Sequence, residues 1–332
     1  MEHQVTIEGG EAFSVAANED TLLRGALRAG VGFPHECSVG GCGACRFELV
    51  SGTMETLWLE APGLAERDRR RGKRLACQSR PTSNCTIRVR CADSYRPIVD
   101  PNRWSAVLLN RRALTPDMSE FTLHVPDAAQ FRPGQYALLY PPMAQGARAY
   151  SMSNLSNGDG LWQFIIRRVP GGASSNALFD IRVGERITLD GPYGHAFLRD
   201  ENERDIICIA GGSGFAPMLS VARGALAQPG SRRVSFFYGA RTQADLGASA
   251  ELDEIAHERL DTTIVLSTPQ VSSPWRGATG FVHEEVERAI ARPLNRYEFY
   301  FAGPAPMVDA IQTLLMQKHQ VPFAQVHFDR FL

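Results

Sequence analysis

Three cysteines lie within nine residues near the N-terminus, and their spacing constrains this chain more than any other feature. They occur in the stretch CSVGGCGACRFELVSG, residues 37–52, as Cys37, Cys42 and Cys45. Three thiols on so short a loop need tight turns without side chains, and the glycines between them provide those turns. We therefore expect the loop to hold a metal centre and RFELVSG to leave it as a strand.

The cysteine pattern also indicates the kind of centre. C-x4-C-x2-C is followed, after 31 intervening residues, by a cysteine in RLACQSRP, which is the plant-type ferredoxin spacing for a [2Fe–2S] cluster held by four thiolates. A zinc site would need a second C-x-x-C or paired histidines, and a Rieske centre would need histidine ligands in the loop. We predict four cluster ligands: Cys37, Cys42, Cys45 and Cys77.

The three other cysteines are expected to be buried without binding a metal. Cys85 and Cys91 alternate with polar residues in NCTIRVRC, which predicts a half-buried strand. Cys208 lies in the apolar run DIICIAGG and is expected in a core. An odd total of seven cysteines does not suit a disulfide framework and agrees with a reducing compartment.

Composition and charge exclude several function classes. The 332 residues suit two or three domains, and 44% hydrophobic with 21% charged residues is typical of a folded protein. A net charge of −1 provides no basic field for nucleic acid. The N-terminus MEHQVTIEGGEAFSV lacks a signal-peptide core, and no apolar run approaches the ~18 residues of a membrane span. We expect a cytoplasmic monomer with no membrane or nucleic-acid partner.

The sequence changes character twice, which predicts three domains. The segment YRPIVDP ends the first domain. Short alternating runs such as WQFIIRRV then predict an antiparallel barrel of about six strands. From Arg204 onward, a strand, a glycine loop and a helix follow one another as in a βαβ unit. The expected ranges are 1–95, a linker at 96–101, 102–202 and 203–332.

Three motifs in the second and third domains point to nucleotides. RAYSMSN, residues 148–154, places a cation, an aromatic ring and hydroxyls along a strand. PGGASSNAL, residues 170–178, has glycines and serines at an expected helix start, where N–H groups and hydroxyls suit a pyrophosphate. GGSGFAP, residues 211–217, is G-x-G-x-x-P where the usual dinucleotide motif ends in glycine. Each motif is weak alone, but their order is specific.

That order, closed by FAGPAPM at residues 301–307, resembles the ferredoxin–NADP reductase superfamily. It is most similar to the reductase components of bacterial multicomponent aromatic oxygenases, such as toluene or phenol monooxygenase and benzoate dioxygenase, over essentially the whole chain. The resemblance implies an N-terminal β-grasp [2Fe–2S] ferredoxin, a six-stranded antiparallel FAD-binding β-barrel and a C-terminal Rossmann-like parallel α/β domain that binds NAD(P).

The resemblance also implies roles for individual residues. Ser151 would lie near flavin nitrogen N5, Asp329 near the hydride path and Phe331 over the flavin face. Arg148 would bind the FAD pyrophosphate, and Tyr150 would lie against the flavin ring. The other implied cofactor contacts are Gly171, Gly172, Ser174 and Ser175 for FAD, and Gly211, Gly212, Ser213, Gly214, Gly303 and Pro304 for NAD. One departure is Ala302, where many relatives carry a cysteine before the Gly-Pro pair.

Electron transfer from a nicotinamide to an iron–sulfur cluster explains why one chain would bind three cofactors. A nicotinamide gives up two electrons as a hydride, whereas an iron–sulfur cluster accepts one at a time, and a flavin can exchange with both. We expect electrons to pass from NADH to FAD, to the [2Fe–2S] cluster, and then to an oxygenase hydroxylase or a Rieske-type ferredoxin, for hydroxylation of an aromatic hydrocarbon. Two alternatives stay open: a reductase of a deoxysugar biosynthesis system, and a redox-sensing flavoprotein without turnover.

Two further expectations concern recognition. Arg241 would suit the 2′-phosphate of NADPH, whereas Asp245 would bind a ribose hydroxyl and repel that phosphate. The aromatic-oxygenase relatives mostly use NADH, so we predict NADH. The acceptor is expected to dock at the loop of residues 38–44. The run ERDRRRGKR, residues 66–74, carries six basic and two acidic residues, and it is either a solvated face or a surface that steers an acidic acceptor.

Overall fold

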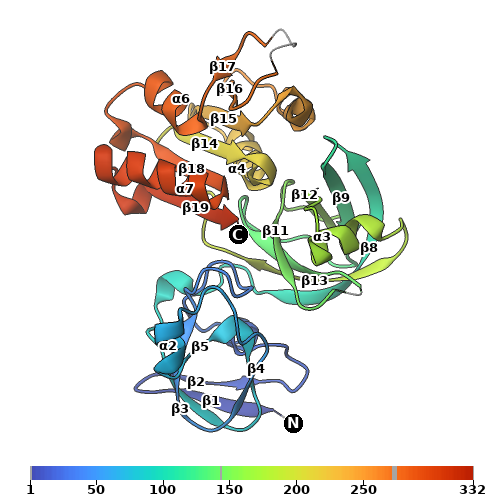
Figure 1. The fold of residues 1–332 in the computed structure, drawn as a ribbon, viewed down its shortest axis with the longest axis vertical. Helices are drawn as coiled ribbons and strands as arrows, with labels where there is room; N and C mark the ends of the chain where they lie inside the picture. Colours follow the sequence, from blue (N-terminus) through green and yellow to red (C-terminus); the bar gives the residue numbers. More distant parts are fainter. Residues whose placement is uncertain (1, 143, 271–274, 332) are drawn as a thin grey trace. The chain divides into compact units, whose positions relative to one another are not determined.

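The computed structural model describes residues 2–142, 144–270 and 275–331, which pack into two compact units (Figure 1). The first unit contains the chain up to Arg103 together with the short segment Asp190–His195. The second unit contains Trp104–Leu189 and the chain from Ala196 onward. The second unit holds most of the barrel and the whole C-terminal domain. Among the described residues, no helix is long and apolar enough to cross a bilayer.

The N-terminal domain is a β-grasp fold. Its main sheet has the order β2-β1-β7-β3-β5, and β1 pairs in parallel with β7. Helix α1 begins after Thr21, whose hydroxyl accepts a hydrogen bond from the N–H of Arg24, and it buries Leu23 and Leu27. The elements are β1 (His3–Ile7), β2 (Ala12–Val15), α1 (Leu22–Arg28), β3 (Arg46–Ser51), β5 (Lys73–Leu75) and β7 (Cys85–Arg88), with β4 (Met54–Thr56), α2 (Glu66–Arg70) and β6 (Ser79–Pro81) beside them.

One strand of this domain is shorter than the sequence predicts. Cys85 is buried in β7 as expected, but β7 ends at Arg88 and leaves Cys91 half-buried outside it. The backbone N–H of Ala92 instead donates to the carbonyl of Gly32, outside the β7 pairings. The prediction that Cys91 belongs to the strand is therefore wrong.

The middle domain is the predicted six-stranded antiparallel barrel. Its sheet has the order β11-β10-β13-β8-β9-β12, and a bridge between Met152 and Phe164 joins the two end strands. Trp162, Phe164 and Ile166 alternate along β12 and all enter the barrel core. The strands are β8 (Asn102–Ala113), β9 (Met118–His124), β10 (Tyr136–Tyr140), β11 (Arg148–Ser151), β12 (Leu161–Arg167) and β13 (Arg186–Tyr193), and α3 (Ala173–Asp180) follows β12.

The C-terminal domain is a parallel sheet of order β17-β16-β15-β14-β18-β19 with helices on both faces. Its strands are β14 (Ile206–Gly211), β15 (Val234–Ala240), β16 (Leu260–Leu266), β17 (Ala278–Thr279), β18 (Glu298–Pro304) and β19 (Val326–Phe331). Its helices are α4 (Phe215–Ala227), α5 (Ala250–Glu254), α6 (Val282–Ala289) and α7 (Ala305–Gln312).

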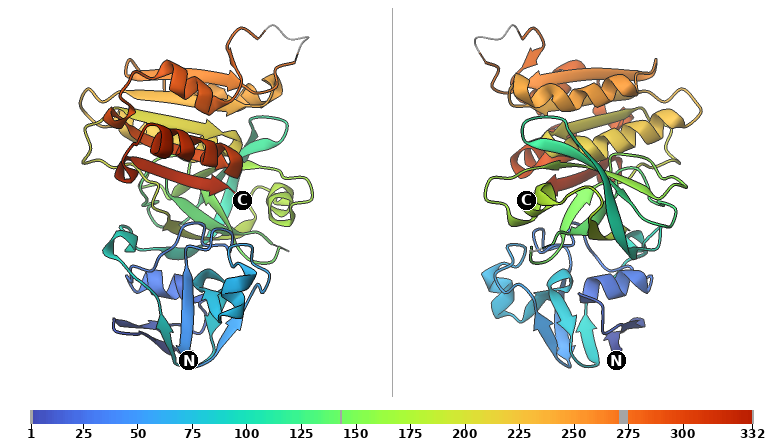
Figure 2. Two further views of the ribbon diagram at one scale, coloured as in Figure 1. Left: turned by 60° about the vertical axis from the view of Figure 1, so that its left-hand side comes forward. Right: turned by 90° about the vertical axis from the view of Figure 1, so that its right-hand side faces the viewer.

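Strand β14 is apolar along its whole length because helices cover both faces of the sheet. Ile206 and Cys208 join the core under α4, whereas Ile207 and Ile209 join the core under α6 and α7. The two views of Figure 2 show these opposite faces, with α6 and α7 in front of the sheet on the left and α4 in front on the right. Cys208 is fully buried, as the sequence predicts.

Candidate functional site

The predicted cluster loop is a tight turn held against the segment that follows β4. Gly43 has a φ of 78°, and a Cβ built on it would lie 2.3 Å from the carbonyl oxygen of Gly63. Only glycine fits this close approach. The N–H of Gly63 also donates to the carbonyl oxygen of Gly40 at 2.9 Å. Backbone contacts therefore hold the loop against this segment.

The loop donates hydrogen bonds to the sulfur of Cys37. The N–H groups of Gly41 and Cys42 each lie 3.3 Å from Cys37 Sγ. A hydrogen bond from the Cys42 thiol and these N–H groups lower the pKa of Cys37 to about 5, against the opposing effect of burial. Thiolate is the form that binds iron, so the chemistry of this donor set suits a metal cluster.

The four predicted ligands form two pairs of thiols. Cys37 lies with Cys42, and the Sγ of Cys45 lies 3.4 Å from the Sγ of Cys77, which follows β5. Among the described residues, no group of three or more His, Cys, Asp or Glu side chains could hold a single metal ion. Two pairs are what a two-iron cluster requires, because each iron takes two protein ligands. The residues present therefore fit [2Fe–2S] better than one ion.

The flavin residues predicted on β11 come from both faces of that strand. Arg148 and Tyr150 are two apart and share one face, whereas Ser151 lies on the other and is buried. Tyr150 packs against the barrel core, and burial raises its pKa to about 12. The Arg148 side chain is exposed and donates to the carbonyl oxygen of Ala147.

The predicted pyrophosphate turn leads directly into α3. Gly171 takes a positive φ, and Gly172 is the residue before the first turn of the helix. Ser175 is committed to this turn, because its hydroxyl accepts from the N–H of Val169 and donates to the carbonyl of Gly172. The hydroxyl of Ser174 is buried with no hydrogen-bond partner. An orphaned hydroxyl at a helix N-terminus fits a phosphate group.

The NAD residues meet where β14 and β18 lie side by side in the sheet. Gly211 ends β14, and residues 212–214 form a short turn that contains Ser213 before α4 begins. A Cβ on Gly214 would lie 2.0 Å from the carbonyl oxygen of Ala302, so this turn can pack on β18 only with glycine. Parallel sheets bind nucleotides at such switch points, beyond the carboxyl ends of the strands.

A cavity of about 400 Å³ opens at this edge, and the predicted Gly211, Gly212, Arg241 and Pro304 line it. The C-terminal strand reaches the same edge. In the pairing of β18 with β19, Asp329 is opposite Ala302 and Phe331 is opposite Pro304. The sheet thus brings the expected nicotinamide-flanking pair Gly303–Pro304 next to the C-terminal residues expected at the hydride path.

Sequence reasoning missed Arg167, at the end of β12. Its guanidinium Nη1 lies 3.0 Å from the position of a Cβ on Gly212, and the side chain lines the cavity. Its Nε lies 2.8 Å from a carboxylate oxygen of Asp117. The only sequence signal was RRV at the end of an alternating strand, which does not show that this arginine crosses from the barrel to the glycine turn.

Arg167 belongs to an alternating network of charges. Arg241 contacts Asp117 at 3.3 Å and Asp245 at 3.1 Å, and Arg167 contacts Asp245 at 3.5 Å. Burial opposes ionisation of Asp245, but the N–H of Thr242 and the guanidinium of Arg241 outweigh it and lower the pKa of Asp245. Two cations and two carboxylates therefore stand together at one end of the cavity, and the Arg241 charge is compensated.

Comparison with protein families divides the chain into three matched regions. Residues 5–82 match the 2Fe-2S iron-sulfur cluster binding domain, and this region includes Cys77 but ends before Cys85. Residues 105–197 match the oxidoreductase FAD-binding domain. Residues 208–313 match the oxidoreductase NAD-binding domain.

Similar proteins extend over the whole chain. The ferredoxin–NAD(P)(+) reductase CarAd of Metapseudomonas resinovorans is 41% identical over 99% of both chains. The xylene/toluene monooxygenase electron transfer component XylA of Pseudomonas putida is 34% identical over 99% of this chain and 95% of its own. The solved structure of the ferredoxin reductase in carbazole 1,9a-dioxygenase has 37% identity and a TM-score of 0.93, covering 100% of this chain and 99% of that one.

Proposed function

Because this chain belongs to the family of three-domain iron–sulfur flavoprotein reductases of oxygenase systems, we propose that it passes electrons from NADH to a protein of such a system. It is an oxidoreductase whose domains bind NAD, FAD and a [2Fe–2S] cluster. The observation that carries the proposal is that one chain holds two pairs of thiols for a cluster and two nucleotide-binding domains, with the FAD-binding domain between the other two in the sequence.

The protein's own task is to bind the flavin and the nicotinamide, to orient them toward each other and to exclude water from between them. A bound flavin accepts a hydride and releases electrons singly, which links a two-electron donor to a one-electron cluster. We assign Ser151 to hydrogen bonding near the flavin nitrogen and Arg148 and Ser174 to the FAD pyrophosphate. The register of β18 and β19 supports placing Phe331 against the flavin and Asp329 beside the nicotinamide. No strong general base is needed, because hydride transfer depends on a donor and acceptor held about 3 to 3.5 Å apart.

On the coenzyme side, we assign the glycine turn of residues 211–214 and Arg167 to the NAD pyrophosphate. The turn supplies backbone N–H groups at the start of α4, and Arg167 supplies a cation above Gly212. We further propose NADH rather than NADPH. Asp117 and Asp245 compensate Arg241, so a 2′-phosphate would meet two carboxylates and gain no unpaired cation.

We propose that the acceptor is an oxygenase hydroxylase or a Rieske-type ferredoxin, and that the system hydroxylates an aromatic hydrocarbon. The names of the xylene/toluene and carbazole relatives support this acceptor class over a deoxysugar system.

We propose domain limits of 1–95, 102–202 and 203–332 with a linker at 96–101, and the three family matches fall inside these limits. We also propose that the protein is a monomer of the cytoplasm, where its thiols would stay reduced.

An anaerobic rapid-mixing experiment tests this function. NADH should bleach the flavin absorbance first and the cluster absorbance after it. Adding the ferredoxin of the carbazole 1,9a-dioxygenase system should then reoxidise both in turn. Bleaching without reoxidation by any oxygenase component would support the redox-sensing alternative. No bleaching by NADH would remove the proposed function altogether.

A further inference from the structure

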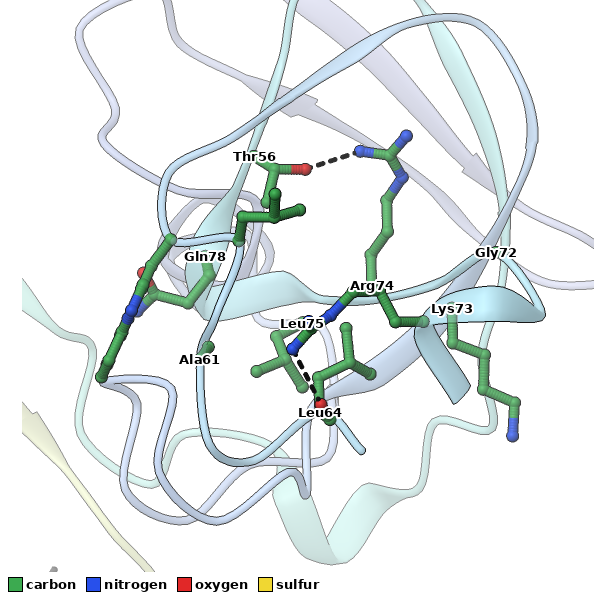
Figure 3. A pocket seen from close by; sticks show the side chains of 11 residues that line it. Thr56, Ala61, Leu64, Gly72, Lys73, Arg74, Leu75 and Gln78 are labelled. Carbon is green, nitrogen blue, oxygen red and sulfur yellow. Dashed lines mark hydrogen bonds between the residues drawn. The ribbon is translucent and has the colours of Figure 1, made fainter. Parts of the chain in front are cut away.

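A second pocket, of about 160 Å³, opens on the [2Fe–2S] domain (Figure 3). Ala61, Leu64 and Leu75 are buried and form an apolar floor. On one side, as Figure 3 shows, Arg74 donates to the hydroxyl of Thr56. The pocket thus lies between the segment that follows β4 and the turn from α2 into β5. Small-molecule sites are usually larger, about 300 to 1,000 Å³, so the size suits one protein side chain.

The pocket has an exposed apolar lip. Leu57, Trp58 and Leu59 are consecutive and are 39%, 42% and 62% exposed. Trp58 and Leu59 also line the pocket. The backbone N–H of Leu57 donates to the carbonyl oxygen of Gln78 at 2.9 Å, which ties the start of this lip to the chain beyond β5. Three neighbouring large apolar side chains in water are unfavourable for the domain alone and are typical of a binding surface.

The same lip touches the cluster loop. A ring carbon of Trp58 and the Cγ of Gln78 both lie 3.2 Å from the position of a Cβ on Gly40, in the turn between Cys37 and Cys42. The side-chain amide of Gln78 lies 3.9 Å from the Sγ of Cys77. Gln78 therefore contacts a cluster ligand on one side and lines the pocket on the other. Gln78 would therefore lie between a protein side chain in the pocket and the thiol of Cys77.

The charge around the pocket is positive. Arg69, Lys73 and Arg74 line it, and Arg67 and Arg71 are exposed nearby on or next to α2. Part of the basic run is compensated, because Arg69 contacts Glu60 at 3.1 Å, Lys73 contacts Asp68 at 3.1 Å, and Arg70 pairs with Glu66. Basic side chains still outnumber the acidic ones. The basic side chains in excess of the carboxylates can attract an acidic partner, whereas the paired ones form an ordinary solvated surface.

We propose that this pocket and its lip, residues Leu57–Leu59, form the docking site for the electron-acceptor protein, which inserts one apolar side chain flanked by carboxylates. The inference rests on the proposed function and specifies its partner surface. A second copy of this chain is disfavoured as the occupant, because a symmetric contact through this face would bring two basic surfaces together. A carboxylate-rimmed acceptor is attracted instead, and the lip brings it to the cluster.

Two substitutions test the proposal with the full-length holoprotein. Leu59→Asp places a carboxylate on the exposed lip, and Arg74→Gln removes a cation from the wall. The probe is the ferredoxin of the carbazole 1,9a-dioxygenase system, and the readout is its NADH-driven reduction at several ferredoxin concentrations. Matched controls in the same domain are Val50→Asp, also exposed, and Arg88→Gln, which pairs with Glu8 and Glu48. NADH reduction of ferricyanide reports on the flavin without docking.

We expect each lip or wall substitution to raise the KM for ferredoxin at least about fivefold, with ferricyanide reduction and cluster absorbance unchanged in all four variants. The Arg74→Gln variant should also lose part of the salt dependence of ferredoxin reduction. If ferredoxin reduction in Leu59→Asp matches that in Val50→Asp, the docking site is wrong while the proposed function stands. If the unmodified protein reduces ferricyanide but reduces neither this ferredoxin nor the hydroxylase component of an oxygenase, the proposed acceptor class fails, and this inference fails with it.

Discussion

The sulfurs of Cys45 and Cys77 lie 3.4 Å apart, although 31 residues separate them in the sequence. The start of β3 and the end of β5 bring them together, because Arg46 and Leu75 are paired in the sheet. The fourth predicted ligand is therefore placed by the fold of the domain, and the loop places the other three. This arrangement permits a sharp test of the ligand set.

Replacing Cys77 with serine should abolish the [2Fe–2S] cluster and leave FAD bound. The iron content should fall from about two atoms per chain toward none, because one iron would lose a thiolate. Cys85→Ser is the matched control, since Cys85 is also buried but hydrogen-bonds only to backbone carbonyls of Thr53 and Ser83. Iron analysis and the visible spectrum measure the result. Retention of a full cluster in Cys77→Ser would mean that another residue is the fourth ligand.

Substitution of Phe331 tests its proposed position against the flavin. Phe331→Ala should lower the rate of flavin reduction by NADH about tenfold or more, because a bound nicotinamide would lose the aromatic surface that orders its approach. The flavin absorbance should also shift. Phe323→Ala, at an exposed site in the same domain, should leave both unchanged. An unaltered reduction rate and spectrum in Phe331→Ala would contradict a position against the flavin.

Much of the fold follows from local sequence signals. Alternation in Trp162, Phe164 and Ile166 predicts a strand with one face in a core, and the barrel confirms it. The apolar run DIICIAGG predicts a strand with Cys208 in a core, and the core under α4 confirms it. Such periodicities report burial directly.

The parts that could not be predicted depend on contacts between distant segments. Nothing in RRV shows that Arg167 reaches Gly212, because the glycine turn follows in another domain. Likewise, the charge count of residues 66–74 cannot show that Glu60, outside the run, contacts Arg69. The pocket beside the cluster loop arises where the segment after β4 meets the turn into β5, and such a cavity leaves no periodic trace in the sequence.

A pH-dependent ion cluster joins α6 to the end of the helical segment Thr313–Lys318, which follows α7. Glu287 contacts Lys318 at 2.7 Å and His319 at 2.9 Å, and these hydrogen bonds lower its pKa to about 2 from an ordinary 4.5. A lowered carboxyl pKa stabilises the fold fully above about pH 4.5, and this contribution is lost as the pH falls toward about 2. Glu287→Gln should therefore lower Tm near neutral pH and show a weaker loss of Tm across that acidic window.

Thermal unfolding of both proteins at a series of pH values measures this difference, with Glu254→Gln as a control on an exposed carboxylate of the same domain. The gap in Tm between the natural protein and Glu287→Gln should narrow on acidification, whereas the control should track the natural protein. A gap that is constant with pH would show that the carboxylate is not the group that titrates.

Arg167 should contribute to coenzyme binding. Arg167→Gln should raise the KM for NADH about tenfold with a smaller change in kcat, because removal of a cation beside the pyrophosphate turn weakens a charge-assisted contact by about 1.4 kcal/mol. The control is Arg182→Gln, since Arg182 is exposed and pairs with Glu185 next to it in the barrel. Steady-state kinetics with ferricyanide measure both. An unchanged KM would show that Arg167 does not bind the coenzyme and only forms ion pairs with Asp117 and Asp245.

The last prediction concerns the choice between NADH and NADPH. Asp245→Asn keeps an oxygen that can accept from the N–H of Thr242 but removes a negative charge beside Arg241. Arg241 would then be partly available to a 2′-phosphate, so the ratio of kcat/KM for NADPH to that for NADH should rise about tenfold. Asp261→Asn, an exposed carboxylate on β16, should leave the ratio unchanged. Equal kcat/KM values for the two coenzymes in the natural protein, or an unaltered ratio in Asp245→Asn, would show that this charge network does not select the coenzyme.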